Sequence, residues 1–187
     1  MVSPTPHPED HALLAAFRVD ATKERAFTDI LKKYSERLYW HIRRLVVSHD
    51  DAHDVLQNMS IKVWKALGDF REEANLYTWL YRIATNESLS FLDAQKRRAS
   101  LSLSDHENSL ENKLIAEKGF DLRKAEWQLQ HAIQSLPEKQ RVVFNLRYYD
   151  EMPYEQMSEV TGTSVGALKA SYHHAVKKVE AFFKAAN

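Results

Sequence analysis

The sequence predicts an all-α protein with two small helical domains joined by a flexible linker, the second of which contains a helix-turn-helix. Apolar side chains recur at helical spacing along most of the 187 residues, and no run alternates apolar and polar residues as a half-buried strand would. The chain also has only four glycines. A stretch rich in Ser, Asn and Asp at residues 99–119 interrupts the helical pattern and predicts the linker.

Composition narrows the classes of function. The hydrophobic fraction of 44% can supply folded cores, while 26 basic and 26 acidic side chains leave no net charge. Binding to nucleic acid would therefore depend on local patches. The absence of cysteine excludes disulfides and thiolate metal sites. No apolar run approaches the ~20 residues of a membrane span, and the N-terminus does not resemble a signal peptide, so we expect a cytoplasmic protein. We also expect no cofactor.

The N-terminal domain is predicted to cover residues 11–98, after a flexible tail at residues 1–10 whose prolines disfavour a helix. A short helix should carry Leu13, Leu14 and Phe17 on one side. A long helix follows, whose core face is formed by Phe27, Ile30, Leu31, Tyr34, Leu38, Ile42 and Leu45. Its opposite side is expected to be solvated and carries Lys32, Lys33, Glu36 and Arg43.

The next predicted helix runs from about Ser48 to Leu67, before Gly68. Polar residues lie away from its apolar stripe, with Trp64 at the border. This face is typical either of a protein-binding surface, where tryptophan is enriched, or of a solvated face beside a half-buried indole. His49 and His53 have metal-ligand spacing, but no further ligands accompany them, and we expect no metal site.

A polar loop and a further helix are predicted between Asp69 and Arg98, with Trp79 directed inward. Tyr77, Tyr81, Arg82 and Asn86 combine aromatic rings with hydrogen-bonding groups. Such a surface suits single-stranded nucleic acid, because bases stack on rings and phosphates attract arginine. Aromatic residues on a helix are also common in cores, so both interpretations remain open here.

The C-terminal domain is predicted to cover residues 120–187. Pro137 and Pro153 are each expected to open a helix, and Gly162 to end the second one before a third begins near Ser164. This third helix has an apolar face, and small, polar or basic residues opposite to it. A helix of this kind can enter the major groove of DNA, although the same helix-turn-helix geometry also occurs in purely structural bundles.

The chain resembles the extracytoplasmic-function (ECF) group of bacterial sigma factors. The resemblance rests on DDAHDVLQNMSIKVWKAL (50–67), DFREEANLYTWLYRIATNE (69–87), the linker, and LPEKQRVVFNLRYYDEMPYEQMSEVTGTSVGALK (136–169), in that order. It implies a transcription initiation factor that binds core RNA polymerase and promoter DNA, as duplex and as melted single strand, and that can be held by an anti-sigma factor. It implies no enzymatic activity and no membrane insertion.

The resemblance also implies site residues. Core polymerase would be bound by Asp54, Gln57, Asn58, Lys62 and Trp64, although the family often has glutamate where this chain has Asn58. The minus-ten promoter element would be melted and bound by Phe70, Arg71, Asn75, Tyr77, Tyr81, Arg82 and Asn86. The minus-thirty-five element would be read by Ser164, Gly166, Ala167, Lys169, Ala170, Ser171, His173, His174 and Lys177. Ala167, Ala170 and His174 make this last face less charged than is usual for the family.

Two other classes of function remain as alternatives. A free-standing helix-turn-helix regulator would bind duplex DNA without polymerase, usually as a dimer on a two-fold site. A helical protein-interaction adaptor would not bind DNA at all. An enzyme is not expected, because the sequence shows no phosphate-binding glycine loop, no metal motif and no nucleophile paired with a base.

Overall fold

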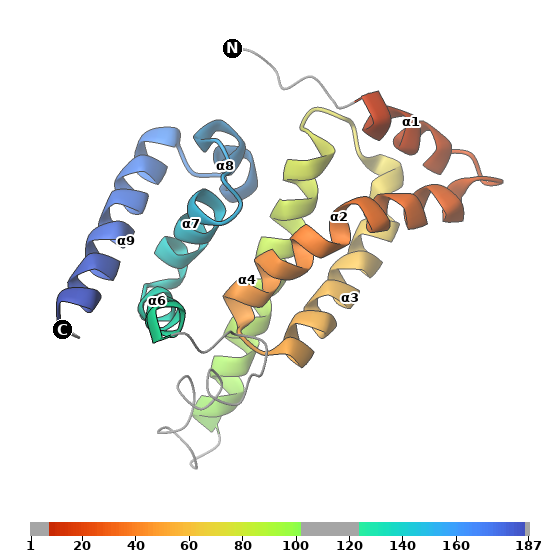
Figure 1. Cartoon of the computed structure of the whole chain (residues 1–187). Helices are drawn as coiled ribbons and strands as arrows, with labels where there is room; N and C mark the ends of the chain where they lie inside the picture. Colours follow the sequence, from red (N-terminus) through yellow and green to blue (C-terminus); the bar gives the residue numbers. More distant parts are fainter. Residues whose placement is uncertain (1–7, 102–123, 186–187) are drawn as a thin grey trace.

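The computed structural model describes residues 8–101 and 124–185, and every element in these two ranges is a helix (Figure 1). The helices are α1 (Pro8–Phe17), α2 (Lys23–Val46), α3 (His49–Ala66), the short 3-10 helix η1 (Leu67–Asp69), α4 (Leu76–Leu101), α6 (Lys124–Gln134), α7 (Glu138–Tyr148), α8 (Tyr154–Thr161) and α9 (Val165–Ala185). The predicted all-α fold is confirmed.

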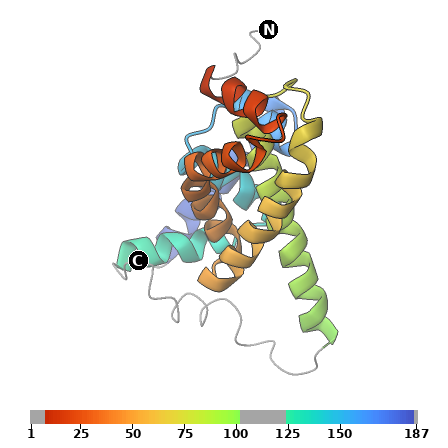
Figure 2. The same ribbon diagram turned by 90° about the vertical axis from the view of Figure 1, so that its right-hand side faces the viewer.

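The N-terminal half is built on three long helices. α2, α3 and α4 each pack against the other two, and α1 lies against α2 and η1. The predicted apolar stripes face inward, since Ile42 of α2, Met59 of α3 and Ala84 of α4 are fully buried. α3 begins where expected because the Ser48 hydroxyl accepts a hydrogen bond from the backbone N–H of Asp51 at 3.2 Å. The C-terminal end of α4 projects beyond the other helices (Figure 2).

α1 begins at Pro8, inside the range that we predicted to be a tail. Proline suits the first turn of a helix, and Asp10 fixes that turn to α2. The Asp10 carboxylate is buried, accepts a hydrogen bond from the Tyr34 hydroxyl at 2.7 Å, and pairs with Lys33 at 2.9 Å. Lys33 is therefore tied to α1 and is not simply solvated as predicted. The preceding residues of the predicted tail, 1–7, lie outside the described residues.

Arg43 also differs from the expectation of a solvated side chain, because only 3% of it is exposed. His41 on the same helix is fully buried. α2 is therefore covered on more than one side, which its apolar periodicity alone does not indicate. Besides α1, α3 and α4, α7 of the C-terminal half packs against α2.

The C-terminal half contains the predicted helix-turn-helix. Pro137 and Pro153 immediately precede α7 and α8, and Gly162 ends α8 with φ at 66°, in the left-handed region that glycine adopts without strain. α9 packs against α6, α7 and α8. Its predicted apolar face is buried at Leu168, Ala175 and Val179, where a small core forms with α6 and α7.

The two halves are in contact along one side of the N-terminal half, where α8 packs against α4 and α7 against α2 (Figure 1). One apolar cluster runs through both halves and joins, for example, Leu80 and Ile42 to Leu146 and Met157. α4 extends to Leu101, into the first residues of the predicted linker. The rest of the linker range, and residues 120–123 and 186–187 of the predicted C-terminal domain, lie outside the described residues.

Candidate nucleic-acid and polymerase interfaces

The outer face of α3 carries polar side chains that point away from the core. Val55, Met59 and Val63 are buried, which turns the opposite side of the helix to solvent. All five candidate residues on that side are exposed: Asp54, Gln57, Asn58, Lys62 and Trp64. The structure therefore brings the five predicted polymerase-binding residues onto one accessible face.

Two of these residues are also held in place by neighbours. The Trp64 indole is 36% exposed and meets the rings of Phe17 and Phe27 edge-on, with centroids 5.4 and 5.0 Å away. The Lys23 ammonium lies 5.4 Å from the centroid of the same indole. Lys62 forms an ion pair with Glu87 of α4. Trp64 is thus an exposed aromatic side chain supported on one side by packed rings, the type of residue that dominates protein interfaces.

Asn75 caps α4. Its side-chain oxygen accepts a hydrogen bond from the backbone N–H of Tyr77 at 3.1 Å, and its backbone oxygen accepts one from Trp79 at 3.0 Å. Asparagine is among the residues preferred at this position, because its oxygen satisfies a backbone N–H that lacks a partner within the helix. The sequence resemblance implies only a DNA-binding role for Asn75, although an asparagine just before a periodic apolar run is also a capping signal.

Phe70 belongs to the core more than to the surface. It is 7% exposed, and its ring lies 4.9 Å from that of Trp79. Arg18, which sequence analysis did not single out, donates a hydrogen bond to the backbone oxygen of Phe70 at 3.0 Å and pairs with Glu72 at 2.9 Å. The loop before α4 is therefore fixed from the residue that follows α1, and Phe70 serves as its anchor.

A groove of about 530 Å³ lies beside this loop. Its walls contain the rings of Phe70 and Trp79 together with the side chains of Arg71 and Arg82. Both arginines are exposed, and so is Asn86 one turn beyond Arg82 on α4. Aromatic walls, guanidinium groups and an amide are the groups that bind an unstacked base and its phosphate.

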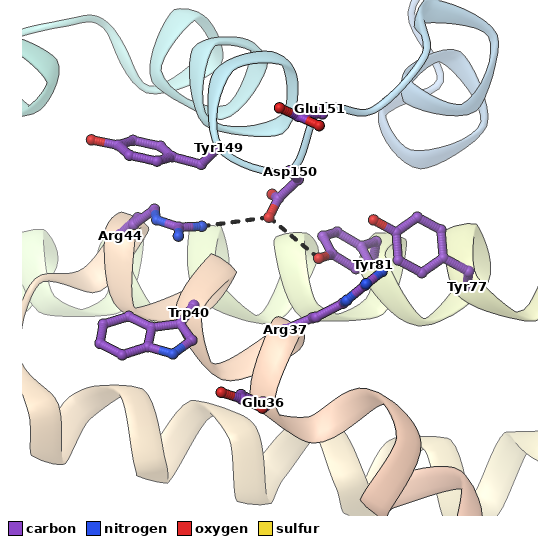
Figure 3. Close-up of a pocket in the computed structure, with 9 residues that line it drawn as sticks. All are labelled: Glu36, Arg37, Trp40, Arg44, Tyr77, Tyr81, Tyr149, Asp150 and Glu151. Carbon is purple, nitrogen blue, oxygen red and sulfur yellow. Dashed lines mark hydrogen bonds and ion pairs between the residues drawn. The ribbon is translucent and has the colours of Figure 1, made fainter.

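Tyr77 and Tyr81 lie on a different side of α4, which faces the C-terminal half. Their rings are 4.5 Å apart, and Tyr81 is only 1% exposed. The Tyr81 hydroxyl donates a hydrogen bond to Asp150 at 3.3 Å (Figure 3). Burial and the neighbouring Asp150 carboxylate raise the pKa of Tyr81, so the phenol stays protonated and donates. In this arrangement Tyr81 is covered and cannot touch DNA.

Asp150, in the loop between α7 and α8, also contacts two residues of α2 that sequence analysis missed. Its carboxylate lies 3.1 Å from the Nδ1 atom of His41 and 3.4 Å from a guanidinium nitrogen of Arg44. Because a carboxylate only accepts, His41 donates from Nδ1. Asp150 and Arg44 line a groove of about 490 Å³ between the halves, which the exposed Trp40 also borders (Figure 3). Along the chain, Asp150 is separated from Arg44 by 106 positions and from His41 by 109. No local sequence pattern indicates contacts over such separations.

The exposed side of α9 gathers the candidate residues for duplex DNA. The Ser164 hydroxyl accepts a hydrogen bond from the backbone N–H of Ala167 at 3.4 Å, at the start of the helix. Ser171 is half-buried, and the other eight candidates are exposed: Ser164, Gly166, Ala167, Lys169, Ala170, His173, His174 and Lys177. Lys178 instead donates to Gln140 of α7 at 2.9 Å. The predicted face exists as one accessible surface.

The described part of the chain holds neither a metal-binding cluster nor a membrane-spanning helix. Within residues 8–101 and 124–185, no group of three or more His, Cys, Asp or Glu side chains is arranged to hold a metal ion. His49 and His53 have their rings 4.5 Å apart, and the Tyr39 hydroxyl lies 2.6 Å from His49 Nδ1. None of the described helices is both long and apolar enough to cross a membrane.

Each half of the chain matches a known protein family. The family model for Sigma-70 region 2 matches residues 30–98, and the model for Sigma-70, region 4 matches residues 126–179. The RNA polymerase sigma-H factor of Pseudomonas aeruginosa is 31% identical over 171 residues, which cover 87% of this chain and 89% of that protein. The ECF RNA polymerase sigma-E factor of Escherichia coli K12 is 30% identical over 177 residues, with the same coverage.

The chain belongs to the ECF group of RNA polymerase sigma factors. This sigma factor binds core RNA polymerase and directs transcription initiation at promoters. Solved structures share its fold. CnrH in complex with the cytosolic domain of CnrY matches with a TM-score of 0.70 at 22% identity, over 95% of this chain and 99% of that one. The sigma factor RpoE from Bartonella quintana, in complex with the anti-sigma factor NepR, matches with a TM-score of 0.65 at 22% identity. This match covers 84% of this chain and 96% of that one.

Proposed function

We propose that this sigma factor divides its work among three surfaces. The outer face of α3 binds core polymerase, the groove beside the α4 loop captures an unpaired base of the minus-ten element, and the exposed side of α9 reads the minus-thirty-five element in the major groove. In this proposal the chain acts as two domains joined by a linker. The domains are residues 11–98 and 120–187, and the linker is residues 99–119. All of this is binding rather than bond-making, carried out in the cytoplasm beside the polymerase.

The exposed side of α9 is the observation that carries this proposal. Small side chains at Ala167 and Ala170 allow a close approach to base edges, while Lys169 and Lys177 extend beyond them toward phosphates. The turn that Gly162 makes before α9 fixes this helix against α8, so the reading side is presented on a rigid support. A helix that only completed a bundle would not need this basic and small-residue side.

The groove beside the α4 loop supports the second surface. Flipping a base out of a duplex costs a few kcal/mol in lost stacking and pairing, and a pocket with aromatic walls and hydrogen bonds offsets that cost. Phe70 and Trp79 provide the rings, and Arg71 and Arg82 the charge. We assign the hydrogen bonds to Asn86 and to the side-chain N–H groups of Asn75.

A protein partner is the proposed means of control. Two proteins of similar fold were solved in complexes, CnrH with the cytosolic domain of CnrY and RpoE with the anti-sigma factor NepR. We extend this kind of partnership to the present chain. An anti-sigma protein that covered α3 or α9 would block the surfaces described above.

Reconstitution tests the proposed function. The purified chain is mixed with core RNA polymerase and genomic DNA, and transcript starts are mapped across the genome. We expect a set of starts that appears only with both components and shares two sequence elements upstream. If the chain neither co-purifies with core polymerase nor produces specific starts, the proposal is wrong. Gln57→Ala should impair binding to core polymerase and spare promoter binding. Lys177→Ala should impair promoter binding and spare binding to core polymerase.

A further inference from the structure

The loop that leads into α4 contains a strained turn beside the groove proposed for base capture. Arg71 and Glu73 line that groove, whereas Glu72 between them does not. The backbone of Glu72 has φ at 58°, in the left-handed region that a residue with a Cβ occupies only at a cost. Such a conformation persists only where surrounding contacts hold it in place.

Arg18 makes the contacts that hold this turn. One guanidinium nitrogen pairs with the Glu72 carboxylate at 2.9 Å, and another donates a hydrogen bond to the backbone oxygen of Phe70 at 3.0 Å. The Glu72 side chain is only 19% exposed, so water screens this pair less than a fully exposed one. Because the N–H groups of a guanidinium lie in one fixed plane, the two contacts set the direction as well as the position of the loop.

The groove-lining residues on either side of Glu72 are not held in this way. Arg71 and Glu73 are exposed, and neither makes a hydrogen bond or ion pair with the described residues. Their side chains are available to a ligand. The backbone that carries them, however, depends on the contacts made at Phe70 and Glu72.

Arg18 itself is attached to a fixed support. It directly follows α1, which lies beside η1 (Figure 1). The first turn of α1 is tied to α2 through the buried Asp10, and its last residue, Phe17, is 1% exposed within the apolar cluster. The Thr22 hydroxyl donates a hydrogen bond to the backbone oxygen of Ala16 at 2.7 Å and fastens the turn between α1 and α2. The guanidinium of Arg18 therefore starts from a defined place.

A direct contact between Arg18 and a phosphate is the competing explanation for an exposed arginine near this groove. Two observations disfavour it. Both terminal nitrogens of Arg18 are already engaged within the protein, and its side chain does not line the groove. An arginine paired with a carboxylate also attracts a phosphate weakly, since the two charges of the pair largely cancel at a distance.

We propose that Arg18 is a positioning residue for base capture. By holding the turn at Glu72, it keeps the groove in the shape that an unpaired base of the minus-ten element fits. The inference rests on the function proposed above for this groove. A preformed groove binds more tightly than one that must become ordered around its ligand, because less loop entropy is lost on binding.

Oligonucleotide binding to the reconstituted holoenzyme measures base capture. A single-stranded minus-ten oligonucleotide from a mapped promoter is compared with versions that are abasic at one position at a time. At the captured position the parent should bind the intact strand about tenfold more tightly than the abasic one, as the stacking of one base would give. Arg18→Ala should lower this ratio by about threefold or more, and a smaller fall overturns the inference.

Arg25→Ala is the matched control for the loss of a positive charge. Arg25 is also exposed, lies on α2, and makes no hydrogen bond or ion pair with the described residues. Arg25→Ala should keep the parent ratio of intact to abasic binding. A fall in this ratio equal to that of Arg18→Ala would show that the effect comes from net charge, and would overturn the inference.

Glu72→Gln separates positioning from a direct DNA contact, because it weakens the ion pair but leaves Arg18 in place. If Arg18 positions the loop, the ratio should fall as with Arg18→Ala, and the double variant should be no worse than Arg18→Ala alone. If Arg18 instead bound a phosphate, its release would strengthen binding of both strands and leave the ratio unchanged, which overturns the inference. Should Arg18→Ala fail to fold by circular dichroism, Glu72→Gln decides the question.

A measurement on the free protein keeps this inference apart from the proposed function. The chain has no cysteine, so Glu73→Cys carries a single nitroxide label without background. Its EPR spectrum should show restricted motion in the parent and with Arg25→Ala, and greater mobility with Arg18→Ala or Glu72→Gln. Equal spectra overturn the inference. If the parent prefers an intact strand at no position, the proposed function of the groove fails, while the spectra still decide whether Arg18 holds the loop.

Discussion

Lys177 and Lys178 are adjacent in α9 but have different surroundings. Lys177 is exposed on the candidate DNA side, whereas Lys178 is held against α7 by Gln140. Ser171, on the candidate side, carries a hydroxyl that can bond to a base edge. The side chains of α9 should therefore differ in whether they contribute affinity, specificity or neither.

Lys177→Ala is expected to weaken promoter binding by the holoenzyme to a similar extent on every sequence. Loss of one phosphate contact should reduce the slope of log affinity against log salt by about 0.9. Lys178→Ala is the control and should leave that slope unchanged. Binding is measured by fluorescence anisotropy over a salt series. An equal loss of promoter affinity in both variants would show that the affinity depends on the total charge of α9 and not on which lysine faces the DNA.

Ser171→Ala should change which bases are preferred and leave the salt slope intact. A bidentate base contact is worth about 1–3 kcal/mol of discrimination, and a single hydroxyl contact should lie at the low end of that range, so the preference at the affected base pair should fall roughly fivefold. Selection from a randomised minus-thirty-five element measures this. A uniform, sequence-independent loss would contradict a role for Ser171 in reading bases.

α4 depends on its cap, and Asn75 separates capping from base recognition. Asn75→Ala removes the cap oxygen and should lower the free energy of unfolding by about 1 kcal/mol, whereas Asn75→Asp keeps an oxygen there and should be nearly neutral. Both variants remove the side-chain N–H groups, so both should slow promoter opening. Urea denaturation and permanganate footprinting of the melted strand give the two readouts. Normal opening by Asn75→Asp would assign Asn75 to the cap alone.

The turn between α8 and α9 depends on Gly162, whose φ is 66°. Gly162→Ala places a Cβ in the left-handed region and should destabilise the protein by about 1–2 kcal/mol. Gly68→Ala is the matched control, because a Cβ there has nothing within 4 Å and φ is not positive. Thermal melting should show a lower midpoint for Gly162→Ala only. Equal shifts in the two variants would mean that the turn is not under this constraint.

The whole molecule shares one apolar cluster between its halves, so their stabilities should be coupled. Leu146 of α7 belongs to that cluster, whereas Ile133 of α6 belongs to the second one; both are fully buried. Leu146→Ala should lower the free energy of unfolding by about 2–5 kcal/mol. It should also reduce the protection of backbone amides in α2 and α4 against hydrogen exchange. Ile133→Ala should loosen α6 and α9 and spare α4. Unchanged protection in α4 with Leu146→Ala would show that the halves are independent.

The sequence by itself determined the helices, the helix-turn-helix and the family. These depend on local spacing, on prolines and glycines at helix ends, and on motifs in a fixed order, all of which can be read without a fold. The exposed faces of α3 and α9 followed for the same reason, since each lies opposite an apolar stripe on its own helix.

Only the tertiary structure decided which polar residues are buried and which surface is covered. Asp10, His41 and Arg43 are buried, and Phe70 is packed on Trp79, although nothing in their local sequence indicates this. Tyr81 meets Asp150 across 69 positions, and His41 meets it across 109. Contacts over such separations leave no periodic trace, because they arise from how helices pack rather than from how each one forms.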